Sequence, residues 1–331
     1  MNDSPFNPDE LAAQVLAGGG PRGSGIYDFM TEQHRVFFAQ LSYLFVGAVD
    51  AAGWPLATVL TVASGFAQSP DPLTLHVAAL PPPGDPAKDA LIPGRDVGIL
   101  GIDFSTRRRN RVNGHILDRE PSGKDSAAGF SVAVSQSFGN CPQYIQRRAL
   151  APLPHVEVLS NVATDTQPRL ESFDHLDAAA AAVIGNADTF FVASRSRAGD
   201  GAAYGADISH RGGRPGFVRV DGDVLTIPDF RGNRYFNTLG NLIGDPRASL
   251  LFVDFDSGDV LQLQGTAQVD WHGDAARQYA GSERLWSFHV ERGWRRRIAL
   301  PLRWSFIDYS RTTLATGTWA TKASALGPNS R

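Results

Sequence analysis

A chain of 331 residues is long enough for two domains of ordinary size, and its formal net charge of −3 gives no general attraction to nucleic acid or anionic membranes. Hydrophobic residues make up 42% of the chain and charged residues 20%, which is typical of a globular protein and excludes a disordered one. The single cysteine, Cys141, excludes an intrachain disulfide framework and a cysteine-rich metal site, so we predict no metal. No stretch is apolar enough to span a membrane and the first residues do not read as a signal peptide, so we expect a cytoplasmic protein without nucleic-acid or membrane partners.

The first half of the sequence reads as two helices followed by a series of short strands. Apolar residues at helical spacing predict helices at 8–16 and 31–41, and the glycine run at 18–20 predicts a flexible lead-in between them. Segments rich in β-branched and aromatic residues, separated by Gly, Pro and Asp turns, predict strands. These strands are residues 43–49, 56–62, 73–77, 97–104 and 111–117.

The second half repeats this plan. Helices are expected at 175–184, which is rich in alanine, and at 274–290. A strand is expected at 156–159 in the connection between the halves, and the small and polar residues from about 317 onward predict a loosely ordered tail. The strands expected in the second half are residues 189–194, 216–220, 223–227, 248–255, 260–269 and 302–309.

An internal comparison shows that the two halves are related. Residues 91–104 align without gaps with residues 242–255, each pair lying 151 positions apart, and the same shift places Gly114 on Gly265. We therefore predict a tandem duplication in a mainly β protein with a few helices, each repeat being an antiparallel sheet closed as a small barrel. The expected divisions are a lead-in at 1–24, a first repeat at 25–174, a second repeat at 175–316 and a flexible tail at 317–331.

Residues 231–241 (RGNRYFNTLGN) carry the chemistry that stands out most in the sequence. They combine two arginines, three asparagines and a threonine, all of which can donate to an anion such as phosphate, with two glycines that let backbone N–H groups come close. With the same shift they face residues 80–90 (LPPPGDPAKDA), which have equal length but are stiffened by proline. Structural need alone would not produce this difference, so we predict an anion site; the alternative is a polar turn.

A second basic stretch lies in the first repeat, at residues 107–114 (RRRNRVNG). As a strand, it places Arg107, Arg109, Arg111 and Asn113 on one face. That face either leans over a bound anion or forms a charged edge strand that discourages aggregation.

Four segments matter together: DISHRGG (207–213), TIPDF (226–230) leading into 231–241, DPRA (245–248) and QSFGNCP (136–142). With them the chain resembles the pyridoxamine 5′-phosphate oxidase-like, FMN-binding split-barrel flavoproteins, and specifically a tandem-repeat branch. The resemblance covers most of residues 25–315. It implies two tandem split β-barrel repeats, FMN as the cofactor and a homodimer.

The resemblance also implies a composite FMN site, either within one chain or across a homodimer. The phosphate side falls on the second repeat and the partner side on the first. The glutamine that the family places five positions before a strand glycine is absent, since Arg109 precedes Gly114 and Val260 precedes Gly265 at that distance. The implied cofactor-binding residues are Ser209, His210, Arg211, Arg231, Asn233, Arg234, Asn237 and Thr238 of the second repeat and Arg109, Gln136 and Ser137 of the first.

The activity implied is flavin redox chemistry on an unidentified small molecule, with a nicotinamide or a protein as possible electron donor. Arg211 and Arg109 are the candidates for the donor that stabilises the charge of reduced flavin. True pyridoxamine phosphate oxidases carry Tyr, Arg and Ser at four-residue steps on a helix, and the nearest match here has Glu283 in the place of the arginine. Because a carboxylate repels the substrate phosphate, we do not expect pyridoxamine 5′-phosphate to be the substrate.

Two alternatives stay open. The protein could bind flavin without catalysis, as a carrier or sensor, and a haem-binding split barrel is the less favoured third reading because no histidine pair has metal-ligand spacing. Cys141 is either a redox-active thiol beside the flavin or a small packing residue.

Overall fold

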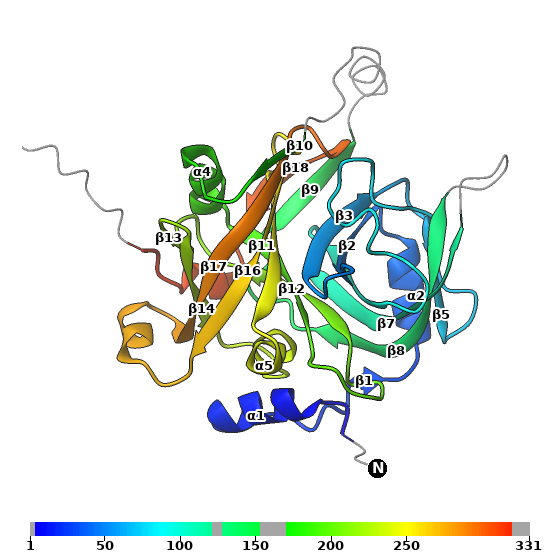
Figure 1. The fold of residues 1–331 in the computed structure, drawn as a ribbon, viewed down its shortest axis with the longest axis horizontal. Coiled ribbons are helices and arrows are strands. Elements are labelled where there is room, and N and C mark those ends of the chain that lie inside the picture. Colours follow the sequence, from blue (N-terminus) through cyan, green and yellow to red (C-terminus); the bar gives the residue numbers. More distant parts are fainter. Residues whose placement is uncertain (1–3, 121–127, 153–169, 320–331) are drawn as a thin grey trace, which may run out of the picture.

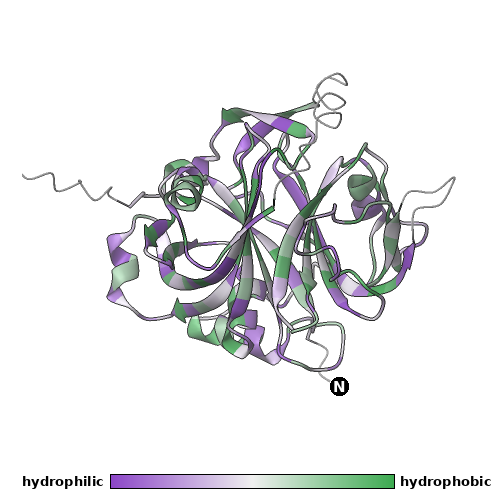
Figure 2. Ribbon diagram, turned by 45° about the horizontal axis from the view of Figure 1, so that its top comes forward, coloured by the Kyte–Doolittle hydropathy of each residue, from purple (hydrophilic) through white to green (hydrophobic). Residues whose placement is uncertain are grey.

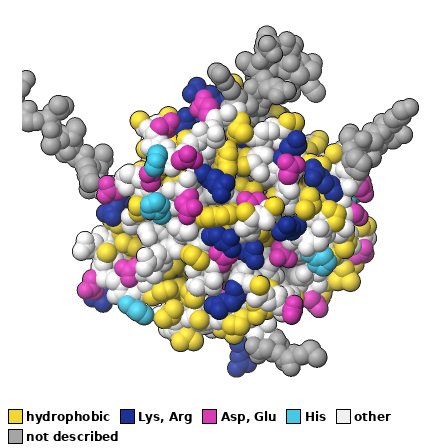
Figure 3. Space-filling view, in the orientation of Figure 1, with side chains coloured by type: hydrophobic (Ala, Val, Ile, Leu, Met, Phe, Trp, Pro, Cys, Tyr) yellow, Lys and Arg dark blue, Asp and Glu magenta, His cyan; other side chains and the backbone are white. Residues whose placement is uncertain are grey.

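The computed structural model describes residues 4–120, 128–152 and 170–319. Two antiparallel sheets of eight strands, one from each half of the chain, lie side by side (Figure 1). A small third sheet pairs β9 (Arg147–Pro152) with β18 (Leu302–Asp308). Basic and acidic side chains are interspersed on the face seen in Figure 3, as the small net charge leads one to expect.

The two large sheets have the same topology. The first has the order β3-β2-β6-β7-β8-β5-β4 with β1 paired to β8, and the second has the order β12-β11-β15-β16-β17-β14-β13 with β10 paired to β17. The strands of the first sheet are β1 (Ile26–Tyr27), β2 (Tyr43–Val49), β3 (Pro55–Thr61), β4 (Ala67–Gln68), β5 (Thr74–Val77), β6 (Asp96–Asp103), β7 (Arg108–Glu120) and β8 (Gly129–Asn140). Those of the second are β10 (Leu170–Phe173), β11 (Thr189–Arg195), β12 (Ala206–Gly212), β13 (Arg219–Asp221), β14 (Val224–Phe230), β15 (Arg247–Val253), β16 (Val260–Asp270) and β17 (Ser282–Arg296).

Strand register repeats along with strand order. Val97 faces Gly114 in the first sheet, and Ala248 faces Gly265 in the second. Both glycines lie at a bulge, and a Cβ on either would come within 2.0 Å of a carbonyl oxygen on the next strand. Only glycine fits such a close approach. The expected fold class, mainly β with a few helices in two tandem split-barrel repeats, is confirmed.

Equivalent residues of the two repeats pack on each other where the sheets meet. Phe45 of β2 and Phe191 of β11 occupy matching register positions and stack with ring centroids 3.5 Å apart. Phe104 and Phe255, 151 positions apart, meet edge to face at 5.3 Å. Contact between a residue and its own equivalent is the mark of a two-fold axis. The single chain is therefore folded like a symmetric dimer, with a shared apolar core between its halves.

Each repeat also has a core of its own, and hydrophobic and hydrophilic positions alternate along many of the strands in Figure 2. Four of the helices start where a side chain caps the first turn: Asn7 before α1, Thr31 before α2, Asp177 before α4 and Ser310 before α6. The helices are α1 (Pro8–Leu16), α2 (Glu32–Ala39), α4 (Ala178–Asn186), α5 (Asn237–Gly244), α6 (Arg311–Leu314) and a 3₁₀ helix at Asp274–Gln278.

The N-terminal segment is a packed part of the fold. Helix α1 has the predicted bounds and lies against α5 of the second repeat (Figure 1). Gly240 of α5 makes this possible, because a Cβ at that position would lie 2.6 Å from the Cα of Glu10. The Asn7 amide donates to Asn241, and Asn237 donates to Glu10 at 2.5 Å. The region that the sequence predicts as a lead-in thus supports the segment with the predicted anion-binding groups.

One expected helix is wrong. Residues 274–290 form the short 3₁₀ helix and most of β17, a 15-residue strand. Trp286, Phe288 and Val290 are buried while His289 and Glu291 are exposed. This two-residue period is that of a half-buried strand, and pairing with both β14 and β16 fixes it. No part of β8 is among the expected strands.

Two expected segments of local structure are not tested by the structure. The expected strand at 156–159 and the tail from 320 onward lie outside the described residues. No helix among the described residues is long and apolar enough to cross a membrane.

Candidate functional site

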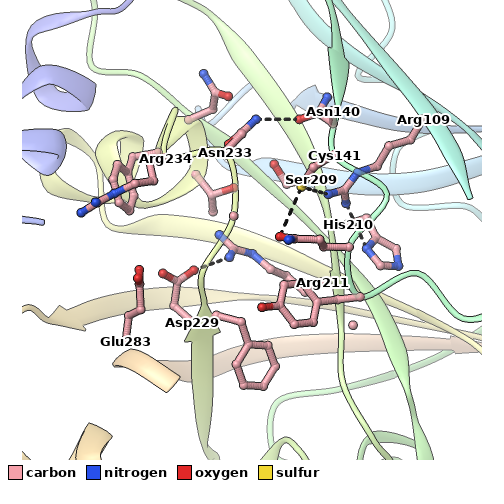
Figure 4. Close-up of a pocket in the computed structure, with 18 of the residues that line it drawn as sticks. Arg109, Asn140, Cys141, Ser209, His210, Arg211, Asp229, Asn233, Arg234 and Glu283 are labelled. Carbon is pink, nitrogen blue, oxygen red and sulfur yellow. Dashed lines mark hydrogen bonds and ion pairs between the residues drawn. The ribbon is translucent and has the colours of Figure 1, made fainter. Parts of the chain in front are cut away.

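A pocket opens between the two repeats, and both contribute to its walls (Figure 4). The first repeat supplies residues of β6, of β7, of the end of β8 and of the segment that follows it. The second supplies β12, β14, the start of β17 and the segment 232–238. The polar and sulfur-containing residues that line it are Arg109, Arg111, Asn140, Cys141, Gln143, Tyr144, Ser209, His210, Arg211, Asp229, Asn233, Arg234, Asn237, Thr238, Glu283 and Arg284.

Arg109 and His210 join the two repeats inside the pocket. The Arg109 Nη1 lies 3.2 Å from Nδ1 of His210, and its Nη2 lies 3.6 Å from the Cys141 sulfur. Burial, and then the neighbouring Arg109 cation, lower the pKa of His210 well below its usual range, so the ring is neutral. A guanidinium can only donate, so Nδ1 accepts and the ring proton sits on Nε2. The His210 Nε2 is buried and has no hydrogen-bond partner in the part of the chain that the structure describes.

Two further arginines converge on one carboxylate. Arg211 of β12 and Arg284 of β17 each donate to Asp229 of β14 at 2.5 Å, one to each carboxylate oxygen. Arg284 also donates to Glu283 at 3.1 Å. Strand pairing brings Asp229 opposite Arg284, which explains why the three meet. Asp229 fixes both guanidinium groups at the pocket wall, and the Nε of Arg211 stays unpaired.

A buried network holds the other side of the pocket. Arg111 of β7 donates to Asp207 at 2.8 Å and to the Ser209 hydroxyl at 2.5 Å. Asn113 and Asn241 donate to the same Asp207 carboxylate. The first repeat's strand and the second repeat's strand and helix are therefore tied at one carboxylate, which positions Ser209 at the pocket.

The segment 231–241 contributes less directly than its composition suggests. Arg234 and Phe236 have positive φ of 62° and 61°, a tight path that leads into α5. The Arg234 guanidinium donates to the carbonyl of Ala17 at the end of α1, and Figure 4 shows it pointing away from Arg109. Asn233 donates to Asn140 of the first repeat at 3.3 Å. Arg234 of this segment thus holds the end of α1, while Asn233 links the two repeats.

The pocket is rich in donors that nothing in the described residues satisfies. Five arginines line it against two carboxylates, those of Asp229 and Glu283. Buried polar atoms are normally paired, so a group of unpaired donors around one cavity indicates a ligand with acceptor oxygens or negative charge. The unpaired buried nitrogens on the lining residues are Arg109 Nε, Arg111 Nε, Asn140 Nδ2, His210 Nε2, Arg211 Nε and Arg234 Nε.

Aromatic side chains form the apolar part of the wall. Tyr144 stacks on Phe230 with ring centroids 5.1 Å apart, and its hydroxyl donates to the carbonyl of Arg231. Phe217 and Phe236 also line the pocket. A flat ring system finds here both a face to pack on and donors at its edges.

Eight of the eleven predicted cofactor-binding residues line this one pocket: Ser209, His210, Arg211, Asn233, Arg234, Asn237, Thr238 and Arg109. Three do not. Arg231 is exposed and contributes only its carbonyl, to Tyr144. Gln136 donates to the carbonyl of Pro5, and Ser137 bonds to His34 at 2.8 Å, so both serve contacts on the N-terminal side.

Several lining residues were not among those predicted. Asp229 lies in the TIPDF segment and Asn140 in the QSFGNCP segment, so both stood within recognised motifs without an assigned role. Arg111 shares its predicted strand face with Arg109. Arg284 carries no signal in the sequence, because only the pairing of β17 with β14 brings it to Asp229.

Comparisons of sequence and of structure give different results. No family model and no curated protein matches the sequence. Three solved structures illustrate the similarity of fold: HupZ of Group A Streptococcus, an FAD-binding protein of Mesorhizobium loti, and a protein of the pyridoxinephosphate oxidase family from Clostridium acetobutylicum. HupZ is 16% identical, with a TM-score of 0.29, and the match covers 36% of this chain and 91% of HupZ. The FAD-binding protein is 10% identical, with a TM-score of 0.26, and the match covers 39% of this chain and 97% of that protein. The Clostridium protein is 15% identical, with a TM-score of 0.24, and the match covers 38% of this chain and 90% of that protein.

These likenesses concern the fold. The two halves share the strand order and register described above, and each of these solved structures covers between 36% and 39% of the chain. Because such folds host more than one function, function has to be argued from the pocket.

Proposed function

We propose that this protein binds FMN in the pocket between its repeats and acts as an FMN-dependent oxidoreductase on a small molecule. The observation that supports this most is that one cavity with aromatic walls is lined by residues carrying six buried donor nitrogens that are unpaired among the described residues. FMN carries a phosphate and ring carbonyl oxygens, which are the acceptors that such a cavity lacks.

The lining residues divide by chemistry. Arg211, Asn233, Asn237 and Thr238 of the second repeat offer donors on the side of the pocket where the resemblance expects the phosphate. Arg109 offers a cation from the first repeat, and His210 offers a neutral Nε2 donor beside it. When bound, FMN supplies hydride and electron transfer. Arg109 and His210 would stabilise negative charge that develops on the ring, since preorganised donors in a buried site cost no reorganisation.

Pyridoxamine 5′-phosphate is not the substrate we propose. The residues nearest to the family's Tyr, Arg and Ser are Tyr279, Glu283 and Ser287. They are not on a helix, and Glu283 lines the pocket. A carboxylate in the pocket wall disfavours a substrate that carries a phosphate. We expect no rapid oxidation of pyridoxamine 5′-phosphate, measured as oxygen consumption by the FMN-loaded protein; rapid turnover would contradict this assignment.

An absorption spectrum of the purified protein tests cofactor identity. Flavin bands are the expected result, a Soret band would indicate haem instead, and the absence of either band after incubation with FMN would overturn the proposal. Catalysis needs a second measurement: anaerobic addition of NADH or NADPH should bleach the flavin bands, and air should restore them. Flavin that neither coenzyme reduces would favour a carrier or a sensor.

A further inference from the structure

The two-fold arrangement of the repeats requires a counterpart of the pocket on the opposite side of the molecule. There the first repeat supplies the segment 80–90, and the second repeat supplies β16 and β17. Residues 80–90 correspond in position to 231–241, and they bring the carboxylate of Asp85 into the interior. The Asp85 side chain has no exposed surface.

Asp85 is held as a bound anion would be. The Arg296 guanidinium donates to it at 2.6 Å, the Thr58 hydroxyl at 2.5 Å and the Gln262 amide at 3.2 Å. The backbone N–H of Ala87 adds a fourth donor at 2.8 Å. Arg296 is itself 2% exposed, so this is a buried ion pair between the first repeat's loop and the second repeat's last long strand.

The three side chains that hold Asp85 have equivalents in the other half. Gln262 corresponds to Arg111, because each faces the matching leucine of the preceding strand. Thr58 and Ser209 face the matching valines Val46 and Val192, and Arg296 and Asn140 face the matching positions 260 and 109. The equivalents of Thr58, Gln262 and Arg296 are Ser209, Arg111 and Asn140, and all three line the candidate pocket.

The position of Asp85 itself is taken in the second repeat by Phe236, whose side chain carries no charge. One half of the molecule thus brings its own carboxylate to this place. In the other half the terminal nitrogens of Arg111 donate to Asp207 and Ser209, and among the described residues nothing pairs with the Arg111 Nε or the Asn140 Nδ2, both on residues that line the cavity.

We propose that Asp85 is a built-in ligand: it fills, with the chain's own carboxylate, the two-fold counterpart of the pocket's anion position. The counterpart is therefore an anion site closed to external ligands, and the chain takes up one external ligand where a symmetric dimer would take up two. Removing the Asp85 side chain would open a second site for a small carboxylate such as formate. This inference does not depend on which anion the candidate pocket binds.

Rescue by formate tests the proposal. In chloride, Asp85→Ala leaves the Arg296 charge buried without its partner, and we expect its unfolding temperature to fall by roughly 10 °C. Formate at the same ionic strength should restore at least half of this loss by replacing the carboxylate. Should Asp85→Ala not fold in chloride, the yield of soluble protein on refolding in formate against chloride gives the same readout.

Three controls make the result specific. Formate should have no such effect on the wild type, on Asp118→Ala, which removes an exposed carboxylate of β7, or on the double variant Asp85→Ala/Arg296→Met, which has lost the cation. Formate that stabilises Asp85→Ala no more than these controls would overturn the proposal. Because no flavin takes part, failure here is separate from failure of FMN to bind.

Discussion

Arg109 is the residue on which cofactor binding depends most directly. It is one of the first repeat's two arginines in the pocket, it bonds to His210 of the second repeat, and valine stands at the equivalent position 260. We expect Arg109→Val to fold and to weaken FMN binding about ten- to hundred-fold, since a hydrogen bond to a charged group contributes about 1.5–3 kcal/mol. Quenching of flavin fluorescence measures the affinity.

Arg231→Ala is the matched control for that variant. The exposed Arg231 side chain does not line the pocket, so its loss should change FMN affinity less than about three-fold, as for other surface positions. A larger effect from Arg231→Ala than from Arg109→Val would show that the phosphate lies outside this pocket.

Glu10 gives the fold a pH dependence of defined sign. Burial, and then the nearby Asp207 carboxylate, raise the pKa of Glu10 to about 8. The folded state therefore holds a proton that the unfolded state releases from about pH 4.5, and the free energy of unfolding falls as pH rises towards 8. In Glu10→Gln the fall of the free energy of unfolding between about pH 4.5 and 8 that is due to Glu10 should disappear. Thermal unfolding of both proteins from pH 5 to 8.5 measures it.

Glu32→Gln, at an exposed position of α2, is the control for Glu10→Gln. It should keep the pH profile of the wild type. Equal profiles for Glu10→Gln and the wild type would mean that Glu10 is ionised in the folded state across this range.

At the scale of elements, helices α1 and α5 stabilise each other and the start of α5 lines the pocket. Gly240→Ala places a Cβ 2.6 Å from the Glu10 Cα, so α1 has to move away. Overpacking of this kind costs about 1–3 kcal/mol. We expect faster hydrogen exchange at residues 8–16 and weaker FMN binding, because α5 positions Asn237 and Thr238.

Gly185→Ala provides the comparison on another helix. A Cβ at Gly185 meets nothing within 4 Å, so this variant should be neutral or more stable by up to about 1 kcal/mol. If both variants exchange equally at residues 8–16, the α1–α5 contact does not order α1.

Local patterns in the sequence predicted the short strands and the capped helices well. They miss β8, and they fail for β17, where residues 274–290 are expected to be a helix, because partner strands decide between the two periods. They also could not predict that α1 packs on α5. That contact joins segments more than 220 positions apart, and its only trace in the sequence is a glycine in α5.

In the candidate site, too, local patterns predict some residues, and long-range contacts that they do not predict decide the others. Composition and motif predicted eight pocket residues, but Arg234 was predicted as an anion ligand and instead donates to the end of α1. Arg284 and Asn140 reach the pocket through strand pairing and through contact between repeats. Neither relation can be derived from one segment's composition.

At the scale of the whole molecule, duplication explains the asymmetry between the halves. Phe45 stacks on its equivalent Phe191, so the two repeats meet as subunits of a two-fold dimer would. Residues of both repeats line the candidate pocket within a single chain, and formation of this pocket does not require a second copy. One chain can therefore keep one side for a ligand and close the other with Asp85.

Titration of flavin-free protein with FMN, followed by fluorescence quenching at protein concentrations well above the dissociation constant, tests the central claim most directly. The account predicts saturation at one FMN per chain, and a dissociation constant for Arg109→Val that is about ten- to hundred-fold higher than that of the wild type. Absence of binding, or saturation at two FMN per chain, would contradict it.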